Sequence, residues 1–342
     1  MNFTSDNAYG AAPEMLEALG AANSGAVASY GEDQLTAQLE STLADVFEHE
    51  VVVFPVITGT AANALALSTL VPSHGAIFCH RDAHIATDEC GAPELFTQGA
   101  TLVTLQGEYG KITPEAMEEA VSHFAIGSVH HSQPAAVSIT QASEMGTCYR
   151  PDELRAIASV AQRHGMKLHM DGARLANALA FLGCRPAEMT WKVGVDALSL
   201  GMTKNGALGA EAVVFFRGED VRDFEFRRKR FGHLISKMRF VAAQLLCGIE
   251  NDRWLAYGRT ANALARVLAN RLGGISGVEI AYPVEANLVF ASMPESLAQK
   301  LRLAGATFYD WGPSRNGRRL VRFVTSFAMP QHDIERLCAA CT

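Results

Sequence analysis

Long blocks of positive charge are missing from this sequence of 342 residues. Its 29 Lys and Arg stand against 36 Asp and Glu, which gives a formal net charge of -7. We therefore expect neither a nucleic-acid partner nor an anionic membrane surface. No apolar run approaches the roughly 20 residues of a membrane span, and no basic segment followed by an apolar one opens the chain. These absences predict a cytosolic protein.

A disulfide framework and dinucleotide-binding loops are also not indicated. The 7 cysteines are scattered, and an odd number in a long chain is not typical of a disulfide framework. The segment CAAC at 338–341 has the spacing of a zinc or redox pair, but no second pair is present to complete a structural zinc site. We expect no bound metal. No G-x-G-x-x-G opens a crossover unit, which argues against a nicotinamide-dependent oxidoreductase.

What the sequence does contain is a regular alternation of strand-like and helical segments. Hydrophobic residues make up 49% of the chain, enough for a large core. Continuous apolar runs are typical of strands that are covered on both faces, and the helical segment 35–47 carries a leucine stripe. The alternation predicts an α/β fold with a mostly parallel, seven-stranded sheet. The expected strands are 51–57, 75–80, 101–105, 135–140, 167–173, 196–201 and 210–216.

The pattern changes past about residue 240. Two helical stretches lead into short strands separated by turns, which predicts a smaller α+β unit with an antiparallel sheet. We therefore expect a large α/β domain with an N-terminal arm over residues 1–245. A small C-terminal α+β domain is expected over residues 246–342.

Lys204 stands in a small-residue segment, SLGMTKNG, between two expected strands. Partial burial would lower the pKa of this lysine and make it a nucleophile that forms a Schiff base with a carbonyl. Asp171 ends another expected strand, at the edge where parallel sheets bind ligands. Taken singly, the two residues also fit ordinary roles, a surface lysine and a helix cap. Together they are what a pyridoxal 5′-phosphate site requires, because the carboxylate keeps the pyridine nitrogen protonated.

Two further segments fit such a site. The segment TGTAAN, residues 58–63, follows a buried strand and opens a helix, so free N–H groups and the helix dipole favour a phosphate there. His84 follows another expected strand, and an imidazole can stack on a pyridine ring and exchange protons near neutral pH. A metal site at His80 and His84 is not favoured, because His80 is expected to end a strand and the pair then lacks helical spacing.

With these residues assembled, the chain resembles the low-specificity L-threonine aldolases, enzymes of the PLP-dependent transferase-like fold. The similarity runs nearly end to end. It implies a lyase that cleaves L-threonine, L-allo-threonine and related β-hydroxy-α-amino acids such as phenylserine to glycine and an aldehyde. The reaction is a retro-aldol cleavage. The matching motifs are FTSDNAYG, SYGEDQLT, TGTAANALAL, DAHIATDECGAPE, AVSITQASEMGTCY, LHMDGARLANAL, GVDALSLGMTKNGALGAEAV, FRRKRFGHLISKMRF and LVRFVTSF.

The resemblance implies a set of cofactor contacts. Lys204 would carry pyridoxal 5′-phosphate covalently, and Asp171 would pair with its ring nitrogen. Arg174 would lie beside the phenolic oxygen of the ring. Gly59 and Thr60 would bind the phosphate through the loop and the helix start.

The resemblance also implies the substrate contacts. His84 would stack on the cofactor ring and help to take the proton from the substrate's β-hydroxyl. Ser5 and Arg322 would hold the substrate carboxylate, which a guanidinium can grip with two hydrogen bonds. The better-known branch of the family carries ENTH where this chain has SITQ, so Gln141 would orient the substrate without taking a proton.

An oligomer with shared active sites is implied as well, with a tetramer built from dimers expected. Tyr30, together with Lys229 or Arg230, would reach the neighbouring subunit's site. The segment KRFGHLISKMR is longer than the corresponding turn of the better-known branch. It leaves open whether Lys229, Arg230, Lys237 or Arg239 meets the phosphate.

Other functions are weighed against this one. A β-eliminating lyase or an aminotransferase would use the same cofactor and the same fold, and would differ in its products. A non-catalytic binding protein that retains the fold is a second alternative, against which the presence of both Lys204 and Asp171 argues.

Overall fold

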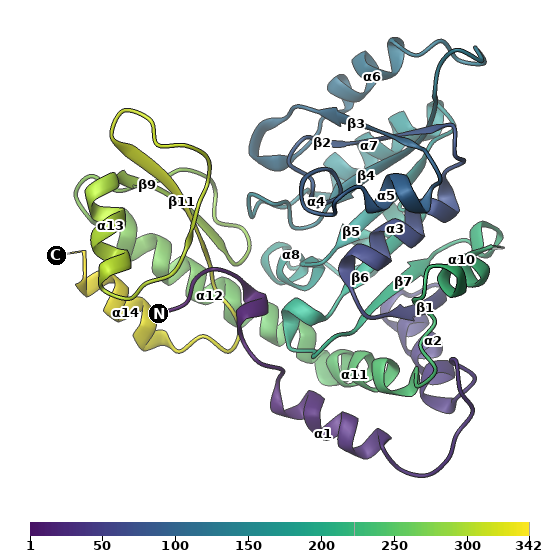
Figure 1. Ribbon diagram of the computed structural model, residues 1–342, viewed down its shortest axis with the longest axis horizontal. Helices are drawn as coiled ribbons and strands as arrows, with labels where there is room; N and C mark the ends of the chain where they lie inside the picture. The colour runs from purple at the N-terminus through teal and green to yellow at the C-terminus, as the bar shows by residue number, and fades with distance from the viewer. Residues whose placement is uncertain (222, 342) are drawn as a thin grey trace.

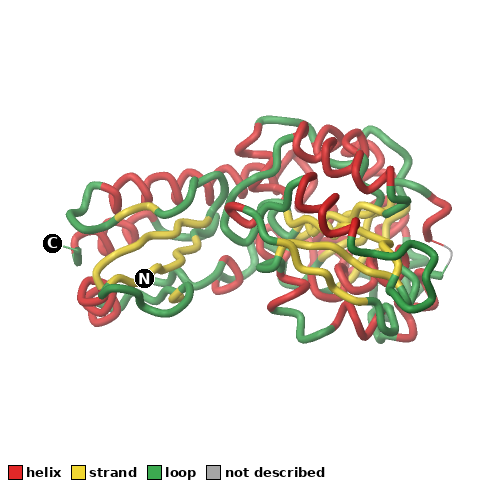
Figure 2. Tube along the Cα trace, turned by 90° about the horizontal axis from the view of Figure 1, so that it is seen from above, coloured by secondary structure: helices red, strands yellow, loops and turns green. Residues whose placement is uncertain are grey.

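The computed structural model describes residues 1–221 and 223–341 and contains two sheets, each with its own hydrophobic core (Figure 1). Seen from above, the larger sheet lies in one lobe of the molecule and the smaller sheet in the other (Figure 2). Among the residues described, no helix combines the length and the apolar character needed to cross a membrane.

The larger sheet has seven strands in the order β1-β7-β6-β5-β4-β2-β3. The strands from β6 through β5, β4 and β2 to β3 are parallel neighbours, whereas β7 runs antiparallel to both β6 and β1. The expected α/β fold with a mostly parallel sheet is confirmed. The strands are β1 (Val52–Val56), β2 (Gly75–His80), β3 (Thr101–Leu105), β4 (Gln133–Thr140), β5 (Lys167–Gly172), β6 (Ala197–Gly201) and β7 (Glu211–Phe215).

Helices cover both faces of this sheet, which explains its apolar strands. Every residue of β2, β6 and β7 is buried. Helix α3 lies against β6 and β7 and is itself buried from Ala61 to Ser68, because its alanines let the backbone approach the sheet closely. The helices of this part are α1 (Pro13–Ala22), α2 (Gln34–Phe47), α3 (Gly59–Leu70), α4 (His84–Thr87), α5 (Ala92–Phe96), α6 (Pro114–Ser122), α7 (Pro151–Arg163), α8 (Leu175–Leu182), α9 (Pro186–Met189), α10 (Phe224–Arg230) and α11 (Arg239–Ile249).

The smaller sheet has four antiparallel strands in the order β10-β11-β9-β8. Helix α12 packs against β9 of this sheet and against α8 of the larger unit, so it joins the two lobes (Figure 1). The elements are α12 (Arg253–Gly273), β8 (Glu279–Ile280), β9 (Leu288–Pro294), α13 (Glu295–Leu303), β10 (Tyr309–Asp310), β11 (Arg318–Val324) and α14 (Gln331–Ala339).

The first residues of the N-terminal arm pack with the smaller unit. Phe3 is fully buried, and its ring meets Phe323 edge-on with the centroids 5.6 Å apart. Its backbone N–H donates to the Thr307 carbonyl. An apolar side chain of this size is stabilised by the nearby core, so the arm crosses back from the larger unit. The boundary at residue 245 stays a prediction.

The strand directions bring several segments to one edge of the larger sheet. Since β7 is antiparallel to both of its neighbours, β1 runs parallel to β6. The carboxyl ends of β1, β2, β5 and β6 therefore meet the amino end of β7 at this edge. Such an edge is where open parallel sheets bind their ligands.

Candidate active site

A pocket of about 510 Å³ opens at this edge. The segments that line it come from the N-terminal arm, the start of α3, the start of α4 and the turn after β6. Lys204, His84 and residues 58–60, which sequence reasoning singled out separately, all line it. The structure therefore brings together the expected lysine, imidazole and phosphate cradle.

Lys204 lies in a tight turn, Thr203–Asn205, directly after β6. Gly206 closes the turn with φ near +103°, a conformation that favours glycine. Burial lowers the pKa of the Lys204 amine, and the nearby positive charge of Arg174 lowers it further. A lysine with a lowered pKa carries more of the neutral amine that attacks a carbonyl.

Asp171 is the last residue but one of β5, the strand beside β6. A Cβ on Gly201 would lie 2.7 Å from the Cα of Ala173, so only a glycine lets the ends of β5 and β6 approach this closely. The Oδ1 atom of Asp171 accepts from the Ala173 N–H at 3.0 Å, and Oδ2 accepts from Asn63 Nδ2 at 2.8 Å. The carboxylate is thus fixed in a buried position next to Ala173, which lines the pocket.

Arg174 is held by Asp6 of the N-terminal arm. The Nε and Nη2 atoms of Arg174 donate to the two carboxylate oxygens of Asp6 at 2.8 and 3.0 Å. Asn287 Nδ2 donates to the same carboxylate at 3.1 Å. Burial alone would raise the pKa of Asp6, but the positive charges of Arg174 and Lys204 keep it below its ordinary value. Ser5 donates to the same carboxylate at 3.3 Å, so the arm is fastened beside the pocket.

Arg322 projects from β11 of the smaller sheet, with its guanidinium 5.4 and 5.2 Å from the ring centroids of Tyr309 and Trp311. Burial lowers its pKa, and the charge of Arg174 adds to this effect. Its Nε atom is enclosed and finds no hydrogen-bond partner among the described residues. Leaving an enclosed donor unpaired is costly, so this partly buried guanidinium suits the binding of an anionic group such as a carboxylate.

His84 is the first residue of α4. Its Nδ1 atom lies 2.8 Å from Oε1 of Glu89, and its backbone N–H donates to Oε1 of Glu144 at 2.9 Å. The Glu89 carboxylate raises the pKa of His84, against the opposing effect of burial. The imidazole borders the pocket and is placed to exchange a proton there.

The start of α3 forms the expected anion cradle. Thr58 caps the helix, its Oγ1 accepting from the Ala61 N–H at 3.1 Å. The first N–H groups of a helix have no carbonyl partner within it. A Cβ on Gly59 would meet no atom within 4 Å, so the space above the helix start is open. Open space, free donors, a nearby amine and a buried carboxylate together fit pyridoxal 5′-phosphate.

Ser5, Gln141, Asp171, Arg174 and Arg322 are not among the residues that line this pocket, and three further expected site residues lie on the exposed surface. Tyr30, Lys229 and Arg230 are exposed and do not line it. The Lys229 amine lies 4.9 Å from the centroid of the Tyr30 ring, so these two side chains meet each other. Arg230 borders a separate hollow on α10.

The contacts of Gln141 do not agree with its expected role of orienting the substrate. Its side chain is fully buried. The Nε2 atom donates to the Tyr149 carbonyl and Oε1 accepts from the Tyr149 N–H, both at 2.9 Å. Both ends of the amide are therefore used to hold the loop after β4, and neither is left to orient a substrate.

Sequence reasoning missed several polar residues around the pocket, chiefly Glu211, Asn63, Glu89 and Glu144. Asn63, Glu89 and Glu211 are buried, and Glu144 is largely enclosed. Glu211 lines the pocket, and burial raises its pKa to about 7. The signal that could have revealed Asn63 and Glu211 is a single polar residue within an otherwise apolar run, in TAANALAL and GALGAEAVVFF.

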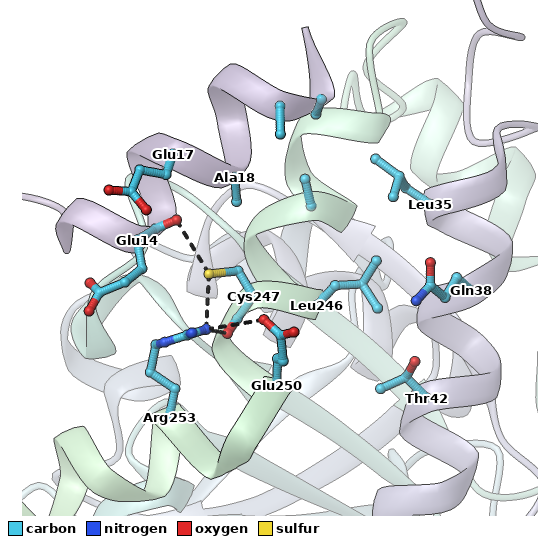
Figure 3. A pocket seen from close by; sticks show the side chains of 13 residues that line it. Glu14, Glu17, Ala18, Leu35, Gln38, Thr42, Leu246, Cys247, Glu250 and Arg253 are labelled. Atoms are coloured by element: carbon cyan, nitrogen blue, oxygen red, sulfur yellow. Dashed lines mark hydrogen bonds and ion pairs between the residues drawn. The ribbon is translucent and has the colours of Figure 1, made fainter. Parts of the chain in front are cut away.

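A larger hollow of about 670 Å³ lies between α1, α2 and α11, and none of the expected site residues borders it. Figure 3 shows Cys247 between Glu14 and Arg253 in this hollow. The Cys247 thiol donates to the Glu14 carbonyl, with Sγ 3.4 Å from the oxygen, and Arg253 forms an ion pair with Glu250 at 3.8 Å. These groups are paired with one another.

Comparison with known proteins connects this geometry to a family. The family model described as beta-eliminating lyase matches residues 2–296. A low-specificity L-threonine aldolase of Pseudomonas aeruginosa is 44% identical over 335 residues, which are 98% of this chain and 94% of that protein. The corresponding protein of Saccharomyces cerevisiae is 28% identical over 283 residues, 82% of this chain and 70% of that one.

Solved structures agree with the sequence matches. A threonine aldolase of Leishmania major superposes with a TM-score of 0.94 at 26% identity, over 99% of this chain and 98% of that one. A serine palmitoyltransferase of Sphingomonas wittichii has a TM-score of 0.73 at 16% identity, covering 100% of this chain and 86% of that one. At that identity the likeness shows a shared fold alone.

Proposed function

The chain belongs to the family of low-specificity L-threonine aldolases, and on this premise we propose that it is an aldehyde-lyase that cleaves β-hydroxy-α-amino acids. The proposed substrates are L-threonine, L-allo-threonine and related compounds such as phenylserine, which yield glycine and an aldehyde. The observation that carries the proposal is one pocket that contains a lysine with a lowered pKa, an imidazole and an open helix start.

Pyridoxal 5′-phosphate is the proposed cofactor, and when bound it supplies an electron-withdrawing ring that stabilises negative charge on the substrate's α-carbon. Lys204 would hold it covalently, and Asp171 would pair with its ring nitrogen. Gly59 and Thr60 would bind its phosphate at the start of α3. Arg174, which Asp6 holds in place, would lie beside its phenolic oxygen.

The remaining side chains act on the substrate. Arg322 and Ser5 would hold its carboxylate, because Arg322 has an enclosed, unpartnered Nε that a carboxylate would satisfy. Fixing the carboxylate orients the bond between Cα and Cβ, and positioning of this kind can contribute strongly to the rate. An imidazole nitrogen of His84 would accept the proton of the β-hydroxyl as that bond breaks.

A homo-oligomer with shared sites is also part of the proposal. Tyr30, Lys229 and Arg230 would serve a neighbouring subunit's site, since they are exposed and lie away from their own chain's pocket. Leu208 lines the pocket and is 66% exposed, which suits a mouth that a second copy covers. A cytosolic location is proposed as well, in keeping with seven cysteines that are all free.

The proposal is tested by product identity. The purified protein with pyridoxal 5′-phosphate is offered threonine, allo-threonine and phenylserine in both configurations at Cα, and the glycine released is quantified. We expect glycine from the L compounds and none from Lys204→Ala. Pyruvate with ammonia would identify a β-eliminating lyase instead, and a keto acid an aminotransferase. Absence of any turnover would favour a binding protein.

A further inference from the structure

A continuous line of hydrogen bonds connects His84 to Asp171 behind the pocket. His84 Nδ1 lies 2.8 Å from Glu89 Oε1, Asn63 Nδ2 lies 2.8 Å from the same oxygen, and Asn63 Nδ2 also lies 2.8 Å from Asp171 Oδ2. The Glu89 side chain is completely enclosed, whereas that of His84 is 37% exposed. Neither Glu89 nor Asn63 has a role in the reaction described above.

The donors in this line can be assigned from its chemistry. Asn63 touches two carboxylates, and its opposite orientation would place the amide oxygen against both of them. The amide nitrogen, with two hydrogens, therefore donates one to Glu89 and one to Asp171. Burial raises the pKa of Glu89 above its ordinary value, against the opposing effect of its contacts with His84 and Asn63. An ionised Glu89 can only accept, and the hydrogen between Oε1 and His84 then belongs to Nδ1. This leaves Nε2 of a neutral His84 without a proton.

We propose that Glu89 is a positioning residue that holds the proton of His84 on Nδ1 and so keeps Nε2 free to accept the substrate's β-hydroxyl proton. The step is a simple proton transfer, in which the hydroxyl oxygen gives up its proton and Nε2 gains it. The imidazolium that results is paired with the Glu89 carboxylate. The inference deepens the proposed function and rests on it for the identity of that proton.

The backbone of His84 is held by a second carboxylate, that of Glu144. Its Oε1 accepts both from the His84 N–H and from Thr140 Oγ1, each at 2.9 Å. The start of α4 is therefore anchored through the main chain, and the ring is anchored separately through Glu89. Replacing Glu89 should release the ring while the backbone of His84 stays in place.

The charged groups around His84 set the direction of the expected effect. Glu89 and Asp171 raise its pKa, whereas burial and Lys204 lower it, and the balance lies above the ordinary value. Glu144 faces it from the loop after β4. A base must be unprotonated, so activity should be lost as the pH falls through this raised pKa. Glu89→Gln removes the carboxylate that raises the His84 pKa most. The loss of activity on acidification should therefore occur at a lower pH in this variant.

The test reads the imidazole directly, by nitrogen NMR of the full-length protein with histidine labelled and with pyridoxal 5′-phosphate present. The His84 signals are those that disappear in His84→Gln. We expect a proton on Nδ1 in the wild type. In Glu89→Gln the His84 pKa should fall by about one unit or more, the acid limb of kcat/KM should move with it, and kcat should fall about 10- to 100-fold. Glu89→Asp should restore part of the pKa.

The chain offers a matched control on its surface. His164 Nε2 lies 2.8 Å from Glu118 Oε2, the same separation as in the proposed pair, but the Glu118 side chain is 40% exposed. Glu118→Gln should leave both the His84 titration and the pH profile of cleavage unchanged.

Two results would overturn the inference: a wild-type His84 with its proton on Nε2, or a His84 pKa that does not move in Glu89→Gln. A fall in activity without a shift of the acid limb would indicate a merely structural role and would also count against it. Failure of the proposed function is distinguishable from failure of this inference. The proposed function fails if no β-hydroxy-α-amino acid yields glycine, whereas the NMR titration of His84 does not depend on turnover.

Discussion

Glu211 is a carboxylic acid at the amino end of β7, where it lines the pocket beside Lys204 and is only 6% exposed. Its Oε2 atom accepts from the Met202 N–H at 3.2 Å. Burial raises its pKa from 4.5 to about 7. The residue therefore stays protonated in the folded protein at a pH where it is ionised in the unfolded chain.

This shift has a defined consequence for stability. Between pH 4.5 and 7 the unfolded state loses the proton that the folded state keeps, so Glu211 lowers the free energy of unfolding as the pH rises through this window. Glu211→Gln cannot titrate, and its stability relative to the wild type should rise by about 3 kcal/mol at most over the window. Thermal denaturation of both proteins from pH 4 to 8 measures the difference.

Glu279→Gln, at an exposed position of β8, serves as the control, and its stability curve should run parallel to that of the wild type. A Glu211→Gln curve that also runs parallel would mean that Glu211 ionises normally in the folded protein.

At the scale of the element, helix α3 both packs against the sheet and forms part of the pocket. Its alanine-rich body packs against β6 and β7, and its first turn faces the pocket. The cap at Thr58 has a close counterpart at Thr113, which caps α6 by accepting from the Ala116 N–H at 3.2 Å. The two helices differ in that only α3 begins at the pocket.

Removing each threonine cap in turn distinguishes the contribution of the cap to stability from its contribution to cofactor binding. Thr58→Ala and Thr113→Ala should each cost about 1 kcal/mol of stability, the usual cost of losing a threonine cap. Only Thr58→Ala should also weaken the binding of pyridoxal 5′-phosphate, by about tenfold, because the loosened helix start presents its N–H groups to the phosphate less well. Equilibrium dialysis measures the affinity. Equal affinities in the two variants would place the phosphate elsewhere.

At the scale of the whole molecule, the exposed Lys229 and Arg230 require a second copy if they are to serve a site. We predict that Lys204→Ala and the double variant Lys229→Ala/Arg230→Ala complement each other. A mixed assembly would then contain one site with Lys204 from one chain and both basic residues from the other.

Co-expression of the two variants with different tags, followed by purification through both tags, isolates the mixed assembly. Its glycine release should exceed that of either parent when pyridoxal 5′-phosphate is limiting. No recovery would show that each site is complete within one chain, and failure to isolate any mixed assembly would argue against a stable oligomer.

The sequence by itself determined the elements and the reactive residues of the larger sheet. Apolar runs, helix stripes and caps located its seven strands, because these signals depend on neighbours a few residues away along the chain. Lys204, Asp171, His84 and the segment 58–60 could be selected because each lies at or just after the end of an expected strand. The carboxyl ends of parallel strands must share one edge of a sheet, so their meeting was predictable in outline.

Only the tertiary structure decided which polar groups touch. It paired Arg174 with Asp6, 168 residues away, placed Arg322 among aromatic rings, and turned Gln141 towards the backbone of Tyr149. It also showed that Asn63 bridges Glu89 and Asp171. Such contacts depend on separations of about 3 Å between atoms distant in the chain, and these are set by the packing of whole elements, which no local pattern in the sequence records.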